Sequence, residues 1–290
     1  MGQRHANNFL NLTPRAELVA AFSPDSREIA WAKENLEPYG VTLYMDYDEM
    51  LNTKHAIKAI AVDKHVLSEK PLMVDAATKK PHLKVMCGFS RRFDPSYRDV
   101  KGKIDAGLIG KPIVFMAKQG TTRSFSGGIF VDCTIHDIDL ALWFFGEENV
   151  VKSIYAAGVT AIEPGLRQYN DCDNAVGIVE FYSGQIAYFY VTRMMAAGQE
   201  DQTFIVGTEG KLTVNQNPAI NLVQIHDKSG VRRQIPQNYF ERFSEGFTRE
   251  ANQFTAAVLY DLPTPLDPQG AVHAVKIARA LQESMTRVRR

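Results

Sequence analysis

Hydrophobic and polar positions follow two different periods in the first ninety residues of the chain. Four short apolar runs are typical of buried strands, and they lie at 17–22, 41–44, 65–68 and 83–89. The stretch 26–36 instead places Ile29, Ala32 and Leu36 at helical spacing, and 47–51 reads as a helical turn. Strands that alternate with helices predict a parallel sheet in an α/β domain.

Beyond residue 110 the strand-like runs follow one another without intervening helices. These runs are 112–118, 151–159, 174–182, 185–193, 203–206, 211–214 and 222–226. The dipeptide Ser183-Gly184 separates two of them, which is a typical hairpin signal, and turns at 208–210 and 228–230 predict two more hairpins. We therefore expect a large, mostly antiparallel sheet in an α+β second half.

Three helices are expected in this second half. Two of them, at 132–145 and 243–259, are predicted to cover one face of the sheet, and the third, at 268–287, ends the chain. The change of pattern divides the chain into a first domain at 1–90 and a second at 91–290. The last helix, 268–287, is a candidate to pack back on the first domain.

Composition narrows the function classes. The 33 basic and 33 acidic residues cancel, which argues against a nucleic-acid or anionic-membrane partner. No run approaches the roughly 18 apolar residues of a membrane helix, and the first residues lack the apolar core of a signal peptide. The three cysteines form neither a disulfide framework nor a metal-binding pair. These counts fit a reducing, intracellular compartment, so we expect a cytoplasmic protein.

The segment Ser68-Glu69-Lys70-Pro71 follows a predicted strand, at the sheet edge where open α/β sheets bind ligands. Pro71 keeps Lys70 out of helical geometry, so the ammonium group can extend over that edge. The alternative is a solvent-exposed turn, since most Glu-Lys pairs are surface pairs of little energetic weight.

A second candidate segment runs from Gly127 to Asp139. On a helix, Asp132 and His136 are four residues apart and share a face, and Asp139 is placed to hold the His136 ring in one tautomer. A histidine flanked by carboxylates suits proton transfer near neutral pH. The alternatives are a histidine satisfied by helix packing or, less favoured, a metal site with Cys133.

Together with Gly88-Phe89-Ser90-Arg91-Arg92-Phe93 and with Gly146, these segments resemble the glucose-fructose oxidoreductase/inositol dehydrogenase/rhizopine-catabolism (Gfo/Idh/MocA) family. The resemblance extends from Gly2 to about Arg287. It implies a Rossmann dinucleotide-binding domain followed by an α+β domain with a large open, mostly antiparallel sheet. The face of that sheet often makes dimers in the family, so we expect a homodimer or homotetramer.

The resemblance also implies roles for individual residues. Lys70 corresponds to the family lysine near the nicotinamide, His136 to the acid/base, and Asp132 to the aspartate that holds substrate and histidine. Glu69 belongs to the cofactor side, and Gly2, which opens a helical stretch, matches the third glycine of the phosphate-binding motif. The substrate surroundings include Asp139 and Arg91, and no metal is expected.

The implied activity is hydride transfer between NAD or NADP and a carbinol carbon of a sugar, polyol or cyclitol-like substrate. A non-redox reaction at Lys70 and His136, such as elimination, isomerisation or cyclisation, is the first alternative. A non-catalytic dimeric binding protein is the second.

The residues after the first predicted strand bear on the cofactor. Ser23 stands where NAD-specific folds place an acid, and Arg27 could pair with the additional phosphate of NADP. Asp25 could take the acidic role instead, or Ser23-Pro24-Asp25 could simply cap the following helix. The pattern favours NADP or dual use.

The family comparison also exposes missing segments. The strand and first two glycines that precede Gly2 in the family are absent, and the chain is short near 53–56, 77–79 and 119–121. In a doubly wound sheet the missing strands are the middle pair, so their neighbours would lack partners. We expect an incomplete nucleotide-binding domain, with chain breaks at these three places.

Overall fold

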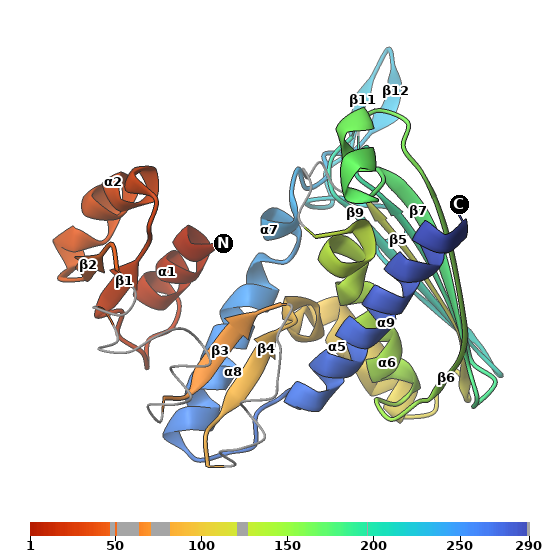
Figure 1. Cartoon of the computed structure of the whole chain (residues 1–290), viewed down its shortest axis with the longest axis horizontal. Helices are drawn as coiled ribbons and strands as arrows, with labels where there is room; N and C mark the ends of the chain where they lie inside the picture. Colours follow the sequence, from red (N-terminus) through yellow and green to blue (C-terminus); the bar gives the residue numbers. More distant parts are fainter. Residues whose placement is uncertain (47–49, 51–63, 71–81, 121–126, 196, 289–290) are drawn as a thin grey trace. The chain divides into compact units, whose positions relative to one another are not determined.

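The computed structural model describes residues 1–46, 50, 64–70, 82–120, 127–195 and 197–288. The chain forms two compact units (Figure 1). The first unit comprises Met1–Ser90 and Glu245–Gln269, and the second comprises Arg91–Ser244 and Gly270–Arg290. The boundary after Ser90 falls where the hydrophobic pattern changes, but the helices near the end of the chain are divided between the units.

The first unit begins with helix α1 (Gly2–Asn11), strand β1 (Ala20–Phe22), helix α2 (Ser26–Asn35), the short η1 (Glu37–Tyr39) and strand β2 (Thr42–Tyr44). β1 and β2 run parallel, and Ala21 lies opposite Leu43. Helix α2 starts at Asp25, whose side chain accepts a hydrogen bond from the Arg27 amide. Ala32 and Leu36 of this helical stretch pack on Val41, as their spacing predicts.

A second parallel pair in this unit joins β3 (Val66–Glu69) to β4 (Val85–Gly88). Among the described strands, the two pairs form separate two-stranded sheets. Whether further strands join the two pairs lies outside the described residues, so the expected incomplete nucleotide-binding domain stays a prediction. The three expected breaks lie in, or directly beside, parts of the chain outside the described residues, as does the predicted turn at 47–51.

Helix α8 (Ser244–Leu259) belongs with this first unit, where the Asn252 side chain donates to the Leu12 carbonyl at 2.8 Å. The expectation that this helix covers the large sheet was therefore wrong. Its apolar spacing identifies a buried face but carries no information about which domain that face meets.

The second unit is built on a six-stranded sheet in the order β10-β9-β5-β8-β7-β6. The strands are β5 (Pro112–Gly120), β6 (Val151–Val159), β7 (Asn174–Phe181), β8 (Ile186–Thr192), β9 (Glu200–Gly207) and β10 (Lys211–Val214). β5 and β8 run parallel, and the other neighbouring pairs run antiparallel. The mostly antiparallel sheet is thus confirmed.

The three predicted hairpins are also confirmed. They join β7 to β8, β9 to β10, and β11 (Ile225–Asp227) to β12 (Gly230–Arg232). Gly184 has φ of 85°, a left-handed conformation that favours glycine at this turn. The run 222–226 was placed too early, because Leu222 is fully exposed and the strand begins at Ile225.

Helices gather on one face of this sheet (Figure 1). A π-helical turn, η4 (Phe130–Thr134), leads into α6 (Ile135–Phe145), and α9 (Pro268–Val288) follows the same face. α9 was a candidate to pack on the first domain. It lies against β7 and β6, since Leu281 and Met285 occupy the space beside Gly177 and Gly158, and its packing on the first domain stays a prediction.

The sequence pattern also missed helix α5 (Pro95–Asp105), although it carries a clear start signal. The Asp94 side chain accepts from the Ser96 and Tyr97 amides, and Pro95 is the first helical residue. The Tyr97 hydroxyl lies 2.9 Å from the Thr203 hydroxyl of β9, which ties α5 to the helix-covered face. The remaining short helices are η3 (Ser90–Phe93), η5 (Pro164–Tyr169) and α7 (Tyr239–Arg242).

Phenylalanine rings form the core between α6 and the sheet. The Phe115 ring centroid lies 6.0–6.5 Å from those of Phe144, Phe145 and Phe189. Such side chains dominate core energetics because each buries a large apolar area. Among the described helices, none has the length and apolar character needed to cross a bilayer.

Candidate active site

Lys70 directly follows β3, so the structure places it at the carboxyl end of a parallel strand as predicted. Glu69 is the last residue of that strand and lies opposite Gly88 of β4. A Cβ atom on Gly88 would lie 3.6 Å from the Glu69 side chain, an ordinary van der Waals contact, so the two strand ends pack closely here. The Glu69 Oε1 atom lies 2.8 Å from His5 Nε2, which links the strand end to α1.

Gly2 opens helix α1, and the start of this helix suits an anion. No side chain caps the helix, and its first turn contains no acidic residue. The first amides of a helix lack intrahelical acceptors and favour a phosphate group. The space around the Gly2 α-carbon is open, since nothing lies within 4 Å of the place a Cβ would take. The described residues therefore fit the pyrophosphate of a dinucleotide here.

The polar groups after β1 are paired among themselves. The Ser23 hydroxyl donates to Glu28 Oε2 at 2.6 Å, and the Arg27 guanidinium donates to Asp25 Oδ2 at 2.6 Å. The Arg27 side chain holds the pKa of Asp25 below its usual range. The two residues that favoured NADP are thus both engaged with carboxylates, and two acids lie at this strand end.

In the second unit, the π-helical turn η4 carries Asp132, and His136 lies in the first turn of α6. Asp132 is buried, and its amide donates to the Gly128 carbonyl at 2.8 Å. The expectation of a shared face assumed about 3.6 residues per turn. A π-helical turn has a wider repeat, so the spacing alone does not fix how the two side chains meet.

The approach to this turn requires glycine. Gly127 and Gly128 have φ angles of 86° and 108°. A Cβ atom on Gly128 would lie 2.8 Å from the Gln282 side chain of α9, so a larger residue would displace that contact. The Gly-Gly pair therefore sets the entry of the segment that carries Asp132 and His136.

Sequence reasoning missed two residues that hold Asp132. Arg193, which follows β8, places one guanidinium nitrogen 3.6 Å from Asp132 Oδ2 and donates from the other to Asp171 Oδ2 at 3.1 Å. The second Asp171 oxygen accepts from the Ile129 amide at 2.9 Å. One signal was available in the sequence. Arg193 ends the predicted strand 185–193, and Asp171 lies shortly before the predicted strand 174–182.

We expected Arg91 and Asp139 in the surroundings of the substrate. In the structure, both side chains form buried ion pairs. Arg91 donates to Asp137 and Asp201, each at 2.6 Å, and Asp139 accepts from Arg92 at 2.6 and 2.8 Å. Both carboxylate oxygens of Asp139 are thus engaged with Arg92 rather than with the His136 ring. Helical spacing could not reveal this competitor, which comes from a distant segment.

Burial changes the pKa values of two carboxyl groups on α6. It raises the pKa values of Asp137 and Asp139, while Arg91 and Arg92 oppose that change. These ion pairs lie in the interior, where the loss of one partner is costly. The ion pairs therefore fix α6, the helix that carries His136, to the segment that carries Arg91 and Arg92. Among the described residues, no group of three or more metal-ligating side chains is found.

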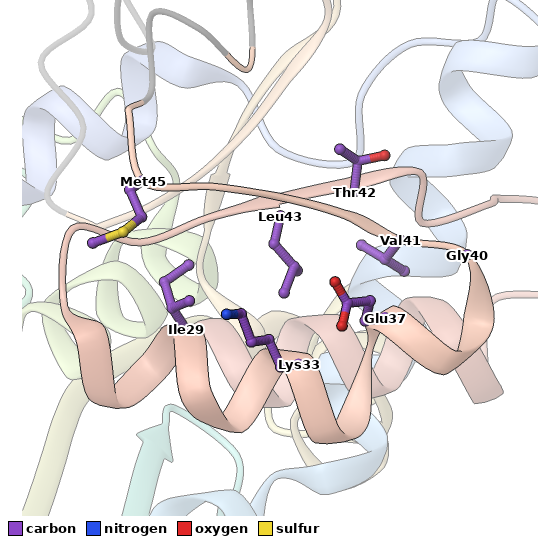
Figure 2. A pocket seen from close by; sticks show the side chains of 8 residues that line it. All are labelled: Ile29, Lys33, Glu37, Gly40, Val41, Thr42, Leu43 and Met45. Carbon is purple, nitrogen blue, oxygen red and sulfur yellow. The ribbon is translucent and has the colours of Figure 1, made fainter.

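A hollow of about 520 Å³ lies between α2 and β2 (Figure 2). Ile29 and Lys33 rise from the helix, and Leu43 points down from the strand toward them (Figure 2). None of the candidate site residues lines it. The hollow is therefore separate from the strand ends where the site residues lie.

Comparisons with known proteins identify similar sequences over most of the chain. Residues 97–213 match the model of the GFO/IDH/MocA C-terminal domain. The scyllo-inositol 2-dehydrogenase (NAD(+)) of Bacillus subtilis is 32% identical over 287 residues, which cover 89% of this chain and 83% of the relative. The Myo-inositol 2-dehydrogenase of Thermotoga maritima is 29% identical, covering 77% and 70%.

Solved structures match nearly the whole chain. Scyllo-inositol dehydrogenase from Lactobacillus casei, with bound NAD(H) and scyllo-inositol, aligns with a TM-score of 0.90 and 30% identity. The alignment covers 99% of this chain and 94% of that one. Myo-inositol 2-dehydrogenase from Lactobacillus plantarum aligns with a TM-score of 0.91 and 30% identity, covering 100% and 95%.

The two-unit fold and its site define an NAD(P)-dependent oxidoreductase that acts on CH–OH groups. The expected fold class and activity are thereby confirmed. The chain belongs to the Gfo/Idh/MocA family. Lys70 lies in the first unit, whereas Asp132 and His136 lie in the second, so their joint action stays a prediction.

Proposed function

We propose that this protein is an NAD-dependent dehydrogenase of inositols, with residues 1–90 serving the cofactor and 91–290 the substrate. The observation that carries the proposal is the near-complete match to a dehydrogenase structure that holds NAD(H) and scyllo-inositol. Inositol dehydrogenases also recur among the relatives of the chain. The presence of Lys70, Asp132 and His136 supports the same chemistry.

Each site residue has a defined task in this proposal. The amides at the Gly2 end of α1 hold the pyrophosphate, and Ser23 and Glu69 face the cofactor from their strand ends. A bound nicotinamide would supply the hydride acceptor for oxidation of the carbinol carbon. His136 takes the hydroxyl proton, and the Lys70 ammonium stabilises the negative charge that develops on the oxygen.

Asp132 binds a substrate hydroxyl in this proposal. Arg193 orients its carboxylate, and Asp171 in turn anchors Arg193. Such a chain of partners fixes the acceptor before substrate arrives. The many hydroxyl groups of a cyclitol suit a site with several fixed polar groups.

NAD, rather than NADP, is the cofactor that we propose. Ser23 and Arg27 are bonded to Glu28 and Asp25, so a 2′-phosphate would compete with two carboxylates. An acidic group near this position favours the free ribose hydroxyl and repels the phosphate. The relative from Bacillus subtilis is named for NAD(+), which supports the same choice.

A homodimer or homotetramer in the cytoplasm completes the proposal. Tyr155, Ile178, Tyr188, Met116 and Phe204 are direct neighbours across five strands of the sheet. Ile178 and Tyr188 are 40% and 36% exposed, whereas Phe181 is 2% exposed and faces the helices. A continuous apolar row on an uncovered face is typical of an interface, here with a second copy.

The test is steady-state formation of NADH by the purified protein with scyllo-inositol, myo-inositol and a panel of sugars. We expect turnover with an inositol and NAD, and its loss in His136→Asn. Tightly held nicotinamide without net turnover of added NAD would favour the non-redox alternative. No reaction with any cyclitol would refute the substrate assignment, although a sugar or linear polyol could still react.

A further inference from the structure

A buried carboxyl group on α8 has no task in the mechanism above. Glu250 is 1% exposed, and neither of its side-chain oxygens has a hydrogen-bond partner among the residues that the structure describes. Buried carboxyl groups are normally paired, because removing a charge from water without compensation is costly. An unpartnered one in the interior of the first unit therefore calls for a reason.

The surroundings of Glu250 identify its neighbours. Phe247, about one turn earlier on α8, meets the His5 ring edge-on with 6.0 Å between ring centroids. The same His5 ring contacts Glu69 at 2.8 Å through Nε2. Glu69 is also the charged group that acts electrostatically on Glu250. The helix face that carries Phe247 and Glu250 thus packs on the His5–Glu69 pair.

The charges around this cluster can be assigned element by element. α1 contributes His5, β3 contributes Glu69 and leads into Lys70, and β4 contributes Gly88, which has no titratable group. On α8 itself, Glu245 and Arg249 pair with each other on the exposed side. Among the described residues, Glu69 is the charged group that acts on Glu250, and Glu69 already binds His5.

Glu250 is buried, whereas the side chains of His5 and Glu69 are 23% and 33% exposed, so a bound proton is favoured on Glu250. Burial first, and then the negative charge of Glu69, raise the pKa of Glu250 well above its usual value. A neutral Glu250 leaves Glu69 free to hold His5, whereas an ionised one would repel Glu69. The protonation state of Glu250 thus decides how firmly the end of β3 is held.

We propose that Glu250 is a positioning residue that, in its protonated form, supports the Glu69–His5 pair and thereby fixes Lys70 at the end of β3. The link to Lys70 is direct, because it is the residue after Glu69. The inference rests on the proposed function only in the task given to Lys70. The cluster itself stands on contacts within the first unit.

The consequence for pH has a definite sign. A carboxyl whose pKa is raised in the folded state binds its proton more tightly folded than unfolded. Stability therefore falls as pH rises from the ordinary carboxyl range to the folded pKa of Glu250. Glu250→Gln keeps the shape and the neutral state but cannot lose a proton, so this variant should lack that fall.

The experiment compares wild type, Glu250→Gln and Glu69→Gln, all as full chains. Thermal unfolding is followed from the ordinary carboxyl range up into alkaline pH, and this measurement needs no substrate. We expect Glu250→Gln to match wild type at the acid end and exceed it increasingly at the alkaline end. Acylation of Lys70, followed by mass spectrometry, should speed up with pH in wild type and stay flatter in Glu250→Gln.

Each outcome decides the matter. Parallel unfolding curves for wild type and Glu250→Gln would overturn the proposal, as would a Lys70 reactivity that differs equally at every pH. Glu69→Gln should raise Lys70 reactivity even at acid pH, because it weakens the bond to His5. If the pH effects appear but no inositol is oxidised, the proposed substrate fails while the positioning role stands.

Discussion

The two units use charged side chains in opposite ways. In the second unit, Arg91 and Arg92 are 3% and 5% exposed and are surrounded by carboxylates beneath α6. In the first unit, the Arg27 side chain is 89% exposed and pairs with Asp25 at the surface. Buried pairs fix one arrangement because any other would leave a charge without a partner. Surface pairs can be exchanged at little cost.

This difference follows the tasks of the two units. In the proposed function, the second unit holds the helix of His136 in one position, and a continuous sheet with buried ion pairs supports that helix. The first unit is proposed to bind a dinucleotide where polar groups lie at the ends of α1, β1 and β3. Substitutions of charged and polar residues in each of the two units therefore test the comparison.

The largest effect is expected at the helix of the second unit. His136→Asn removes the proposed proton acceptor but retains a polar side chain, so kcat should fall by about 10²–10⁴-fold. Binding of NADH, measured by fluorescence titration, should change little because the cofactor residues lie in the first unit. A parallel loss of NADH affinity would show that the division of tasks is wrong.

The next effect concerns stability. Arg91→Met leaves Asp137 and Asp201 buried without their cation, which should lower the free energy of unfolding by about 3–5 kcal/mol. The matched control is Arg27→Met, which removes a fully exposed guanidinium and should leave the denaturant midpoint unchanged. Equal midpoints for the two variants would contradict the contrast between buried and surface charge.

The features of the fold and of the site that could be predicted are those that residues close together in the sequence determine. Strands 151–159 and 211–214 were predicted with their observed bounds, because alternating side chains and Gly-containing turns are local signals. Lys70 was correctly placed at a strand end for the same reason. Asp132 and His136 were recognised by their spacing and by the family resemblance.

Two errors were local, since β11 begins later than predicted and α5 was missed, but the others concerned partners that are distant in sequence. Asp139 was expected to meet His136, but Arg92 lies beneath the helix and binds it in two places. Likewise, the amphipathic patterns of α8 and α9 were visible, but not the unit that each one joins. Arg193 and Asp171 were missed because a buried arginine is identified only once the fold brings carboxylates to it.

Association through the sheet should respond to a single charge in the apolar row. Tyr188 lies between Ile178 and Met116 on neighbouring strands, so Tyr188→Glu places a carboxylate at its centre. We expect association to weaken by at least about 2 kcal/mol, visible as a shift to monomer in sedimentation analysis. Tyr182→Glu, which changes a 72% exposed side chain at a hairpin turn, is the control. An unchanged mass for Tyr188→Glu would show that the interface does not include this apolar row.

A smaller effect is expected where the second unit orients a site residue. Arg193→Lys keeps the positive charge but cannot span Asp132 and Asp171 in the same geometry. The kcat/KM for inositol should fall by about tenfold, while the KM for NAD stays the same. An equal change in both constants would indicate a general loss of structure.

The smallest effect belongs to the surface pair of the first unit, and it concerns the choice of cofactor. Asp25→Asn removes one negative charge beside Ser23, yet asparagine caps a helix as well as aspartate does. Because Arg27 holds the pKa of Asp25 below its usual range, wild type carries that charge throughout the neutral range. The ratio of kcat/KM for NADP to that for NAD should rise by about two- to fivefold, a small change because the site is exposed.

Asp227→Asn is the matched control, since Asp227 pairs with Arg232 at the surface of the second unit. An unchanged ratio in both variants would assign the discrimination to Glu28, the other carboxylate at this strand end, and Glu28→Gln would then produce the shift that Asp25→Asn did not.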